Sequence, residues 1–284
     1  MFHYLNGKLI KEKEPKIYAF DLGFLRGYGL FDYLRTYGPY PFLLKEHLLA
    51  FFKRAKLCHL KIPLSLSQVE KVIFKLIKKN YSGKDLGFRL IVTGGPDPFY
   101  TQKRKKNSFF ILTNLIPQYP KSFYQKGIKL LSLVQERAVP FLKSLSSYFN
   151  SYQAYQQAKR KKFDDVLFLD KDKRILECFN SNFFAIKKNE LLTPSLSEKI
   201  FGGATRNFVL NLARENGLRI KERVIFFKEI KTFSEAFLTS TSKEIMPVAK
   251  INNLKMKAPG SFTIFLSSLF KKEVEKFKCS KTLP

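Results

Sequence analysis

Hydrophobic and polar residues follow two different periods along the chain, and these periods predict a mixture of strands and helices. Runs that alternate every second residue, or are almost wholly hydrophobic, predict strands at residues 2–11, 30–37, 41–44, 88–92, 109–112, 128–133, 166–169, 183–186 and 236–240. Runs with helical spacing predict helices at residues 46–59, 66–79, 148–161, 206–216 and 262–277. The chain is therefore expected to have an α+β fold, and no internal repeat is visible.

Local signals refine three of these elements. Asn6-Gly7 is typical of a tight turn, so residues 2–11 should form a hairpin. Ser65 or Ser67 is expected to cap the helix at 66–79. The hydrophobic face of the helix at 46–59 is expected to contain Leu48, Leu49, Phe52 and Ala55.

Two prolines, Pro117 and Pro120, interrupt both periods near the middle of the chain. A length of 284 residues is enough for two modest domains. We therefore expect a small N-terminal domain at residues 1–116, a linker at 117–122 and a larger C-terminal domain at 123–284.

The composition describes a folded but strongly basic protein. Hydrophobic residues make up 45% of the chain and include 30 Phe, which is enough for a sizeable core. The net charge of +29 has three interpretations: binding of nucleic acid, attraction of a small anionic substrate or cofactor, or a general compositional bias. Because the lysines are spread along the chain, we favour bias, then attraction of anions, and expect no nucleic-acid partner.

Other features narrow the class of protein further. Cys58, Cys178 and Cys279 are too scattered for a disulfide framework or a zinc site, so no metal is expected. No uncharged hydrophobic run is long enough to span a membrane, and the first residues lack the pattern of a signal peptide. We therefore expect a cytoplasmic protein that does not enter a membrane.

Four segments contain residues suited to chemistry on a phosphorylated cofactor. Lys143 follows Pro140-Phe141-Leu142, and an apolar environment favours the uncharged amine that Schiff-base formation requires. Glu177 ends a hydrophobic run, Gly202-Gly203 precedes a helix, and four hydroxyl residues occupy 239–242. Each feature alone also has an ordinary explanation: a surface lysine, a solvated glutamate, a helix cap or a polar turn.

The order and spacing of these segments resemble the class IV (fold-type IV) aminotransferases, from Tyr4 to about Ile251. The N-terminal signature of that family is Asn-Gly, Asp-x-Gly, Gly-x-x-Phe-Glu and Arg. In this chain it stands as Asn6-Gly7, Asp21-Leu22-Gly23, Gly27-Tyr28-Gly29-Leu30-Phe31-Asp32 and Arg35. The resemblance implies a two-domain fold like that of D-amino acid aminotransferase, with a small α/β domain and a larger domain of mixed sheet flanked by helices. It also implies pyridoxal 5'-phosphate (PLP) as cofactor and a homodimer.

The same resemblance assigns roles to individual residues. The Schiff-base lysine falls on Lys143, the partner of the PLP phenolic oxygen on Tyr148, and the carboxylate facing the pyridine nitrogen on Glu177. The remaining cofactor-binding positions are Asn182, which closes the glutamate motif, Phe201 against the ring, and Gly203, Ala204, Thr205 and Thr241 at the phosphate.

The chain departs from the family pattern at one cofactor position. Ala50 stands where the family has a phosphate-binding Arg, and the loss of such a bond weakens binding by roughly 1.5–3 kcal/mol, about one to two decades in Kd. Lys53 and Arg54, one helical turn later, are candidate substitutes. Asp32 replaces the usual Glu.

On the substrate side the resemblance suggests Arg26, Phe31 and Arg89, although Arg89 could equally form a structural salt bridge. The function expected is transfer of an amino group between a small or branched-chain amino acid and a 2-oxo acid. Alternatives are an aminodeoxychorismate lyase or a D-amino-acid transaminase, whose members usually have an apolar residue at the position of Tyr148. A third alternative is a basic binding protein on a scaffold of reduced catalytic power.

Overall fold

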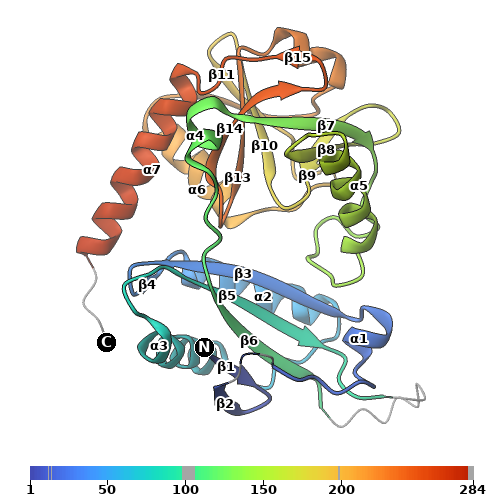
Figure 1. Ribbon diagram of the computed structural model, residues 1–284, viewed down its shortest axis with the longest axis vertical. Helices are drawn as coiled ribbons and strands as arrows, with labels where there is room; N and C mark the ends of the chain where they lie inside the picture. The colour runs from blue at the N-terminus through green and yellow to red at the C-terminus, as the bar shows by residue number, and fades with distance from the viewer. Residues whose placement is uncertain (12, 14, 98–105, 198, 281–284) are drawn as a thin grey trace. The chain divides into compact units, whose positions relative to one another are not determined.

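The computed structural model describes residues 1–11, 13, 15–97, 106–197 and 199–280, and these fall into two compact units (Figure 1). The first unit contains Met1–Pro117, the short segment Leu142–Ser146 and the end of the last helix from Phe277. The second contains Gln118–Phe141 and Ser147–Lys276. The sequence predicted one continuous C-terminal domain from residue 123, whereas the structure groups the segment around Lys143 with the N-terminal unit. Pairing between segments distant in sequence causes this difference.

The first unit is a six-stranded antiparallel sheet with the strand order β2-β1-β6-β5-β3-β4. Its strands are β1 (Phe2–Leu5), β2 (Lys8–Lys11), β3 (Gly29–Tyr37), β4 (Tyr40–Pro41), β5 (Leu86–Thr93) and β6 (Ser108–Leu115). Its helices are α1 (Leu22–Arg26), α2 (Leu44–Leu57) and α3 (Leu66–Asn80). The predicted hairpin is confirmed, with Leu5 opposite Lys8 and both turn residues at positive φ.

Of two predictions about the helices of this unit, the cap of α3 was correct and the buried face of α2 was partly wrong. Ser65 caps α3 by accepting a hydrogen bond from the backbone N–H of Gln68, as expected. The predicted face of α2 was wrong in part, because Leu49 is 52% exposed. The residues of α2 that are buried are Leu44, His47, Leu48, Phe51 and Ala55. Hydrophobic residues cover more of this helix than one face, so their spacing did not select which of them are buried.

The strand predicted at residues 41–44 was also wrong in extent. β4 ends at Pro41, and α2 begins at Leu44. Leu43, at the start of the helix, has a φ of +52°, which ends the extended conformation.

The second unit is a nine-stranded mixed sheet. Its main path runs β12-β11-β10-β13-β14-β7-β8-β9, and β15 pairs with β14. The strands are β7 (Ile128–Val134), β8 (Asp165–Leu169), β9 (Ile175–Cys178), β10 (Asn182–Lys187), β11 (Glu190–Thr193), β12 (Arg219–Glu222), β13 (Glu235–Ser240), β14 (Glu244–Ile251) and β15 (Leu254–Lys255). The helices are α4 (Lys121–Lys126), α5 (Tyr148–Arg160), α6 (Ala204–Glu215), the 3-10 helix η1 (Phe227–Thr232) and α7 (Ser261–Cys279).

The predicted long elements of this unit are confirmed to within a few residues, whereas β9, β11, β12, β14 and β15 were not predicted. The core consists of hydrophobic side chains of the sheet, with residues such as Leu167, Phe183 and Leu238 wholly buried. Strands β9, β10 and β13 are neighbours: Asn182 lies opposite Glu177 on one side and Thr239 on the other. Three of the predicted cofactor residues, Glu177, Asn182 and Thr241, therefore lie at one end of these three strands.

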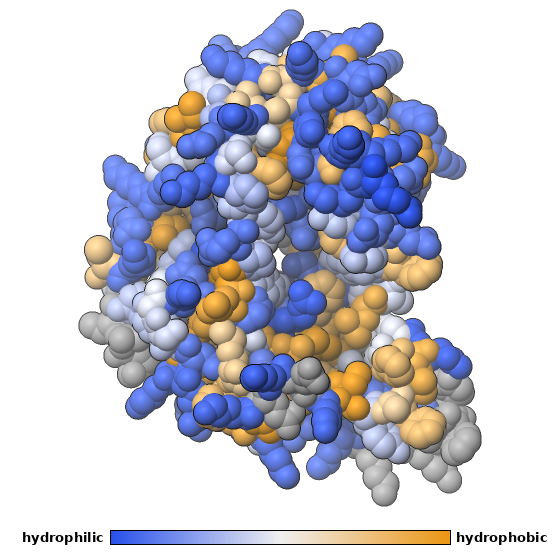
Figure 2. Space-filling view, in the orientation of Figure 1, coloured by the Kyte–Doolittle hydropathy of each residue, from blue (hydrophilic) through white to orange (hydrophobic). Residues whose placement is uncertain are grey.

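The surface agrees with the basic, polar composition. Figure 2 shows hydrophilic residues over most of the face drawn, with smaller hydrophobic patches between them. Among the residues described, no helix is both long and hydrophobic enough to cross a lipid bilayer.

Candidate active site

Lys143 is held by main-chain hydrogen bonds to β3. The backbone N–H of Phe31 donates to the carbonyl of Lys143 at 2.9 Å, and the N–H of Leu145 donates to the carbonyl of Gly29 at 3.0 Å. Leu30 and Ser144 form an antiparallel bridge between these two bonds. The segment Leu142–Ser146, which we call the lysine segment, is thus joined to the edge of β3 that β5 does not occupy. Main-chain bonds fix the backbone of the lysine within the first unit.

Two glycines of the N-terminal signature make room for the lysine segment. Gly27 has a φ of +64°, and a Cβ there would lie 2.8 Å from the Cβ of Ser146. A Cβ on Gly29 would lie 2.8 Å from the Cδ1 of Leu145 and 2.9 Å from the carbonyl oxygen of Val92. Both separations are shorter than van der Waals contact, so a side chain at either position would displace the segment.

The Lys143 amine lies in a cluster of charged groups centred on Asp32. Its Nζ is 3.3 Å from Asp32 Oδ1, and His47 Nδ1 is 3.4 Å from the same oxygen. Arg54 Nη1 lies 3.5 Å from Asp32 Oδ2. Burial by itself would raise the pKa of the Asp32 carboxyl, but the charges of Lys143, His47 and Arg54 outweigh burial and hold that pKa well below its usual range. Asp32 is therefore a buried carboxylate in contact with the predicted reactive amine.

The two candidates for the missing phosphate-binding arginine occupy different surroundings. Lys53 is on the exposed face of α2. The Arg54 side chain is only 16% exposed and reaches Asp32. Ala50, one helical turn earlier, is half-buried. Of the two, only Arg54 comes close to the cluster that contains Lys143.

Of the three predicted substrate residues, Phe31 lies near Lys143, Arg89 lies near Phe31, and Arg26 lies at the end of α1. Phe31 lies between two cations: its ring centre is 5.9 Å from Lys143 Nζ and 5.6 Å from the Arg89 guanidinium carbon. Arg89 is exposed, on the strand next to β3, and also lies 5.8 Å from the ring of Tyr33. Arg26 is exposed at the end of α1, where it donates to the carbonyl of Leu25. Phe31 thus lies near both Lys143 and Arg89.

In the second unit, Glu177, which the resemblance assigns to the pyridine nitrogen, has a buried carboxylate. It is 4% exposed, at the end of β9. Its Oε2 accepts a hydrogen bond of 3.1 Å from the backbone N–H of Phe201, and its Oε1 lies 3.3 Å from Arg137 Nη1. These contacts orient the carboxylate and keep it beside Phe201, which is itself buried.

Arg137 is a site residue that sequence reasoning missed. It is 9% exposed, donates to the carbonyl of Phe179 at 2.6 Å, and lies 3.4 Å from the Tyr148 hydroxyl. Burial lowers the pKa of its guanidinium, but Glu177 and Tyr148 outweigh burial and raise it. The available signal was an arginine directly before the apolar residues Ala138-Val139-Pro140, because a cation in such a stretch needs a partner. Arg137 links two predicted cofactor residues, Glu177 and Tyr148.

The N-terminus of α6 presents backbone donors suited to an anion. Gly203 precedes the helix without a side-chain cap, so the N–H groups of Ala204 and Thr205 have no intrahelical partner. Asn182 donates from Nδ2 to the carbonyl of Phe201 at 2.7 Å, and a Cβ on Gly203 would lie 2.5 Å from Asn182 Oδ1. Thr205, the second residue of α6, is buried. Thr241 is half-buried in the turn after β13, the strand that pairs with β10.

These residues fit PLP by the chemistry of their donors and acceptors. A buried carboxylate suits a protonated pyridine nitrogen, and an uncapped helix N-terminus with threonine hydroxyls suits a phosphate. Gly203 leaves room for Asn182, since a Cβ at that position would lie 2.5 Å from Asn182 Oδ1. Within the first unit lies the amine of Lys143, and within the second lie the carboxylate of Glu177 and the uncapped start of α6.

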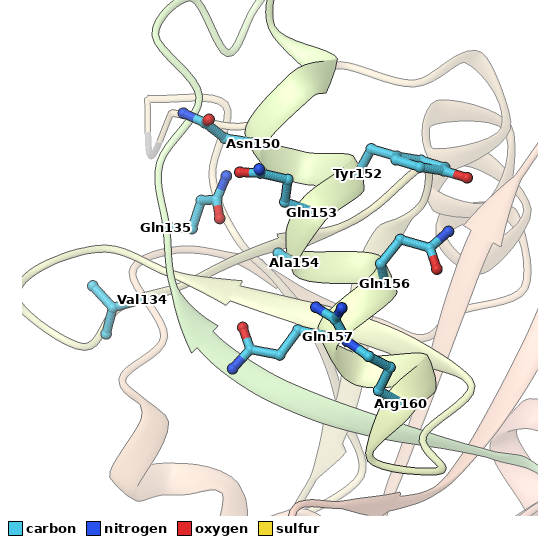
Figure 3. A pocket seen from close by; sticks show the side chains of 9 residues that line it. All are labelled: Val134, Gln135, Asn150, Tyr152, Gln153, Ala154, Gln156, Gln157 and Arg160. Atoms are coloured by element: carbon cyan, nitrogen blue, oxygen red, sulfur yellow. The ribbon is translucent and has the colours of Figure 1, made fainter.

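A separate pocket in the second unit has different chemistry. It has a volume of about 610 Å³ and lies between the end of β7 and α5 (Figure 3). Its polar lining is mostly amides: Gln135, Asn150, Gln153, Gln156 and Gln157, with the cation of Arg160 at one end. No predicted site residue lines it, so this pocket is not the candidate active site.

Comparison with known proteins gives consistent matches over nearly the whole chain. The family model described as amino-transferase class IV matches residues 29–251. A putative branched-chain-amino-acid aminotransferase of Methanocaldococcus jannaschii is 33% identical and covers 98% of this chain and 96% of its own. An aminodeoxychorismate lyase of Bacillus subtilis is 30% identical over 96% and 94%.

A solved structure shows the same fold. The branched-chain aminotransferase of Thermoproteus uzoniensis, crystallised with norvaline, superposes with a TM-score of 0.89 at 24% identity. The alignment covers 96% of this chain and 94% of that one.

Proposed function

The chain belongs to the class IV aminotransferases, and from this premise we propose that it transfers an amino group between a small or branched-chain amino acid and a 2-oxo acid, with PLP bound to Lys143. The observation that carries the proposal is the position of Lys143. Its backbone is fixed to β3, and its amine is 3.3 Å from the Asp32 carboxylate. When bound, PLP supplies an aldehyde carbon and an electron-withdrawing ring that stabilises negative charge at the substrate Cα.

The residues of the first unit handle the amine and its proton. Lys143 Nζ removes the proton from the substrate Cα and later returns it, as general base and acid. Asp32 holds the Nζ in place by accepting a hydrogen bond from it at 3.3 Å, a bond that the uncharged amine can also donate. His47 and Arg54 in turn fix the orientation of Asp32. We assign Arg54 to the phosphate side, in the place of the arginine that Ala50 replaces. Lys53 remains a weaker candidate because it is exposed.

The residues of the second unit orient the cofactor. Glu177 would keep the pyridine nitrogen protonated, and Arg137 and the Phe201 N–H hold Glu177. Tyr148 orients the phenolic oxygen, with its own hydroxyl beside Arg137. The phosphate would be held by the backbone of Gly203, Ala204 and Thr205 at the start of α6. The hydroxyl groups of Thr205 and Thr241 would hold it as well. Asn182 supports this helix start through its bond to the Phe201 carbonyl, and the Phe201 side chain would pack on the ring.

The substrate side is assigned to Phe31 and Arg89. Phe31 gives a hydrophobic contact close to Lys143, and the exposed guanidinium of Arg89 is suited to a substrate carboxylate. Arg26, at the end of α1, is a further candidate for the same carboxylate. A small or branched-chain amino acid fits a site that offers one aromatic face and one carboxylate partner.

A second candidate function keeps the cofactor and changes the reaction. The B. subtilis lyase is almost as similar to this chain as the archaeal aminotransferase, so an aminodeoxychorismate lyase is the main alternative. A D-amino-acid transaminase would use the same residues. Tyr148 beside Arg137 favours the branched-chain type over both. A basic binding protein of reduced catalytic power is a third alternative, opposed by the presence of both Lys143 and Glu177. We also propose a cytoplasmic homodimer, on the strength of the family alone.

The direct test is PLP binding by purified protein. We expect a visible absorbance band that borohydride abolishes, and a borohydride-reduced peptide in which PLP is attached to Lys143. Lys143→Ala should lose both signals, whereas Lys129→Ala, at an exposed lysine on β7, should keep them. Branched-chain amino acids should bleach the band with release of the 2-oxo acid. A colourless protein whose mass does not change after PLP and borohydride treatment contradicts the proposal, and release of pyruvate from aminodeoxychorismate indicates the lyase instead.

A further inference from the structure

A second lysine, Lys243, is more deeply buried than Lys143 and has no role in the function proposed above. It is 7% exposed, two residues after Thr241 in the turn between β13 and β14. Its Nζ has three acceptors: Asp165 Oδ2 at 2.6 Å, Asn180 Oδ1 at 2.6 Å and Ser181 Oγ at 2.9 Å. An ammonium has three protons to donate, so these acceptors satisfy it completely.

The three acceptors connect separate parts of the second unit. Asp165 is the first residue of β8 and is 2% exposed. Asn180 and Ser181 form the turn between β9 and β10, the turn that separates Glu177 from Asn182. The carbonyl of Lys243 also accepts a hydrogen bond from the Tyr124 hydroxyl. One side chain thus joins the turn that contains Thr241 to the turn that follows Glu177, and joins both to the start of β8.

We propose that Lys243 is a positioning residue for the cofactor site: it holds the turn that contains Thr241 and the β9–β10 turn at fixed spacing, so that phosphate and pyridine ring are bound together. This inference rests on the proposed function. The three bonds account for the charge of Lys243, so the residue is not a second reactive amine. Burial lowers the pKa of its ammonium, but Asp165 outweighs burial and raises it, which keeps the ion pair intact at neutral pH.

The alternative is that the ion pair only stabilises the fold, and two variants separate these roles. Lys243→Met leaves Asp165 buried without its charged partner, which destabilises the unit as well as freeing the turns. The double variant Asp165→Asn/Lys243→Met removes both charges, and the oxygen of the new amide can still accept the hydrogen bond that the Val166 N–H donates to Asp165. Replacing both partners of a buried pair is often neutral for stability. The ties to Asn180 and Ser181 are absent in both variants.

The experiment measures PLP affinity by absorbance titration, and hydrogen exchange of residues 179–182 and 240–243 in the cofactor-free protein. In Lys243→Met and in the double variant we expect PLP affinity to fall about tenfold or more, because each loses hydrogen bonds to a charged group. We also expect hydrogen exchange in both turns to become faster. The double variant should recover most of the thermal midpoint without recovering affinity. Lys187→Met is the matched control, since it removes a lysine–glutamate pair of 3.0 Å elsewhere in this unit and should change neither reading.

The outcomes are distinct. Affinity within twofold of the unchanged protein in either variant overturns the positioning role, and so does a double variant that recovers affinity together with stability. Unchanged exchange in both turns of either variant overturns it without reference to the cofactor. If the unchanged protein fails to bind PLP, the proposed function fails first, and the exchange result then shows only whether Lys243 restrains the turns.

Discussion

Replacing Asp32 by Asn should destabilise the first unit by about 3 kcal/mol at pH 7, the lower end of the range for breaking a buried ion pair. The carboxylate is 2% exposed and lies within 3.5 Å of the charged atoms of Lys143 and Arg54. Asparagine has nearly the same shape and can still accept the hydrogen bond that the Tyr33 N–H donates to Asp32. The variant therefore changes the charge and little else.

The magnitude comes from two opposing contributions. At an effective dielectric of ~20, unit charges separated by about 3.4 Å attract by about 5 kcal/mol. The buried carboxylate has lost several kcal/mol of hydration, a penalty that the neutral amide largely avoids. The attraction wins because Asp32 has several cationic neighbours, and the variant leaves Lys143 and Arg54 close together without their shared anion.

The pH dependence has a definite sign. The pKa of folded Asp32 is lowered, so its contribution is fully present above the pKa of the unfolded carboxyl, about 3.9. It is lost as the pH falls from that value through the folded pKa. The stability difference between the two proteins should therefore be the same at pH 5 and pH 7 and should shrink below about pH 4.

The assay is urea unfolding of the cofactor-free protein, followed by circular dichroism because the chain contains no Trp. Asp85→Asn is the matched control: Asp85 pairs with Arg35 at 2.7 Å but its side chain is 32% exposed, so a loss of about 1 kcal/mol or less is expected. A loss for Asp32→Asn no larger than that of the control, or a difference that persists undiminished at pH 3, would refute the reasoning.

Three further predictions concern other positions. Gly27→Ala puts a Cβ at positive φ against the lysine segment, so urea unfolding should show a loss of at least about 1–2 kcal/mol and borohydride should trap less PLP; unchanged trapping would contradict this. Gly203→Ala pushes Asn182 away from the start of α6, so PLP affinity measured by absorbance titration should be about tenfold weaker. Unchanged affinity would mean that this helix start is not the phosphate site. The hydrogen bond from Arg223 lowers the pKa of Glu229 from 4.5 to about 2. The thermal midpoint of Glu229→Gln should therefore lie below that of the unchanged protein, by a constant amount above pH 4.5. This difference should shrink as the pH falls and disappear near pH 2.

Local chemistry in the sequence predicted the elements whose causes are local. Asn6-Gly7 makes a turn through its own backbone preferences, and Ser65 caps α3 through a bond to Gln68, three residues away. Neither feature depends on the rest of the fold. The sequence also predicted Lys143 and Glu177 as site residues, but through the order and spacing of several motifs rather than through the surroundings of either residue.

The surroundings of those residues depend on contacts between distant parts of the chain. Lys143 is separated from its partner Asp32 by 111 positions, and Lys243 from Asp165 by 78. A pattern that spans a few residues therefore cannot predict either pair. The buried Arg137 beside Glu177 is of the same kind.

The sequence by itself thus determined the periods and the turns, because backbone preference and residue type act over a few positions. It gave candidates for the reactive groups through the order of its motifs. Only the tertiary structure decided that Leu49 of α2 is exposed, that the lysine segment joins β3, and which charge faces which. Burial and ion pairing are properties of three-dimensional neighbours, and their energies are fixed only when the fold brings those neighbours together.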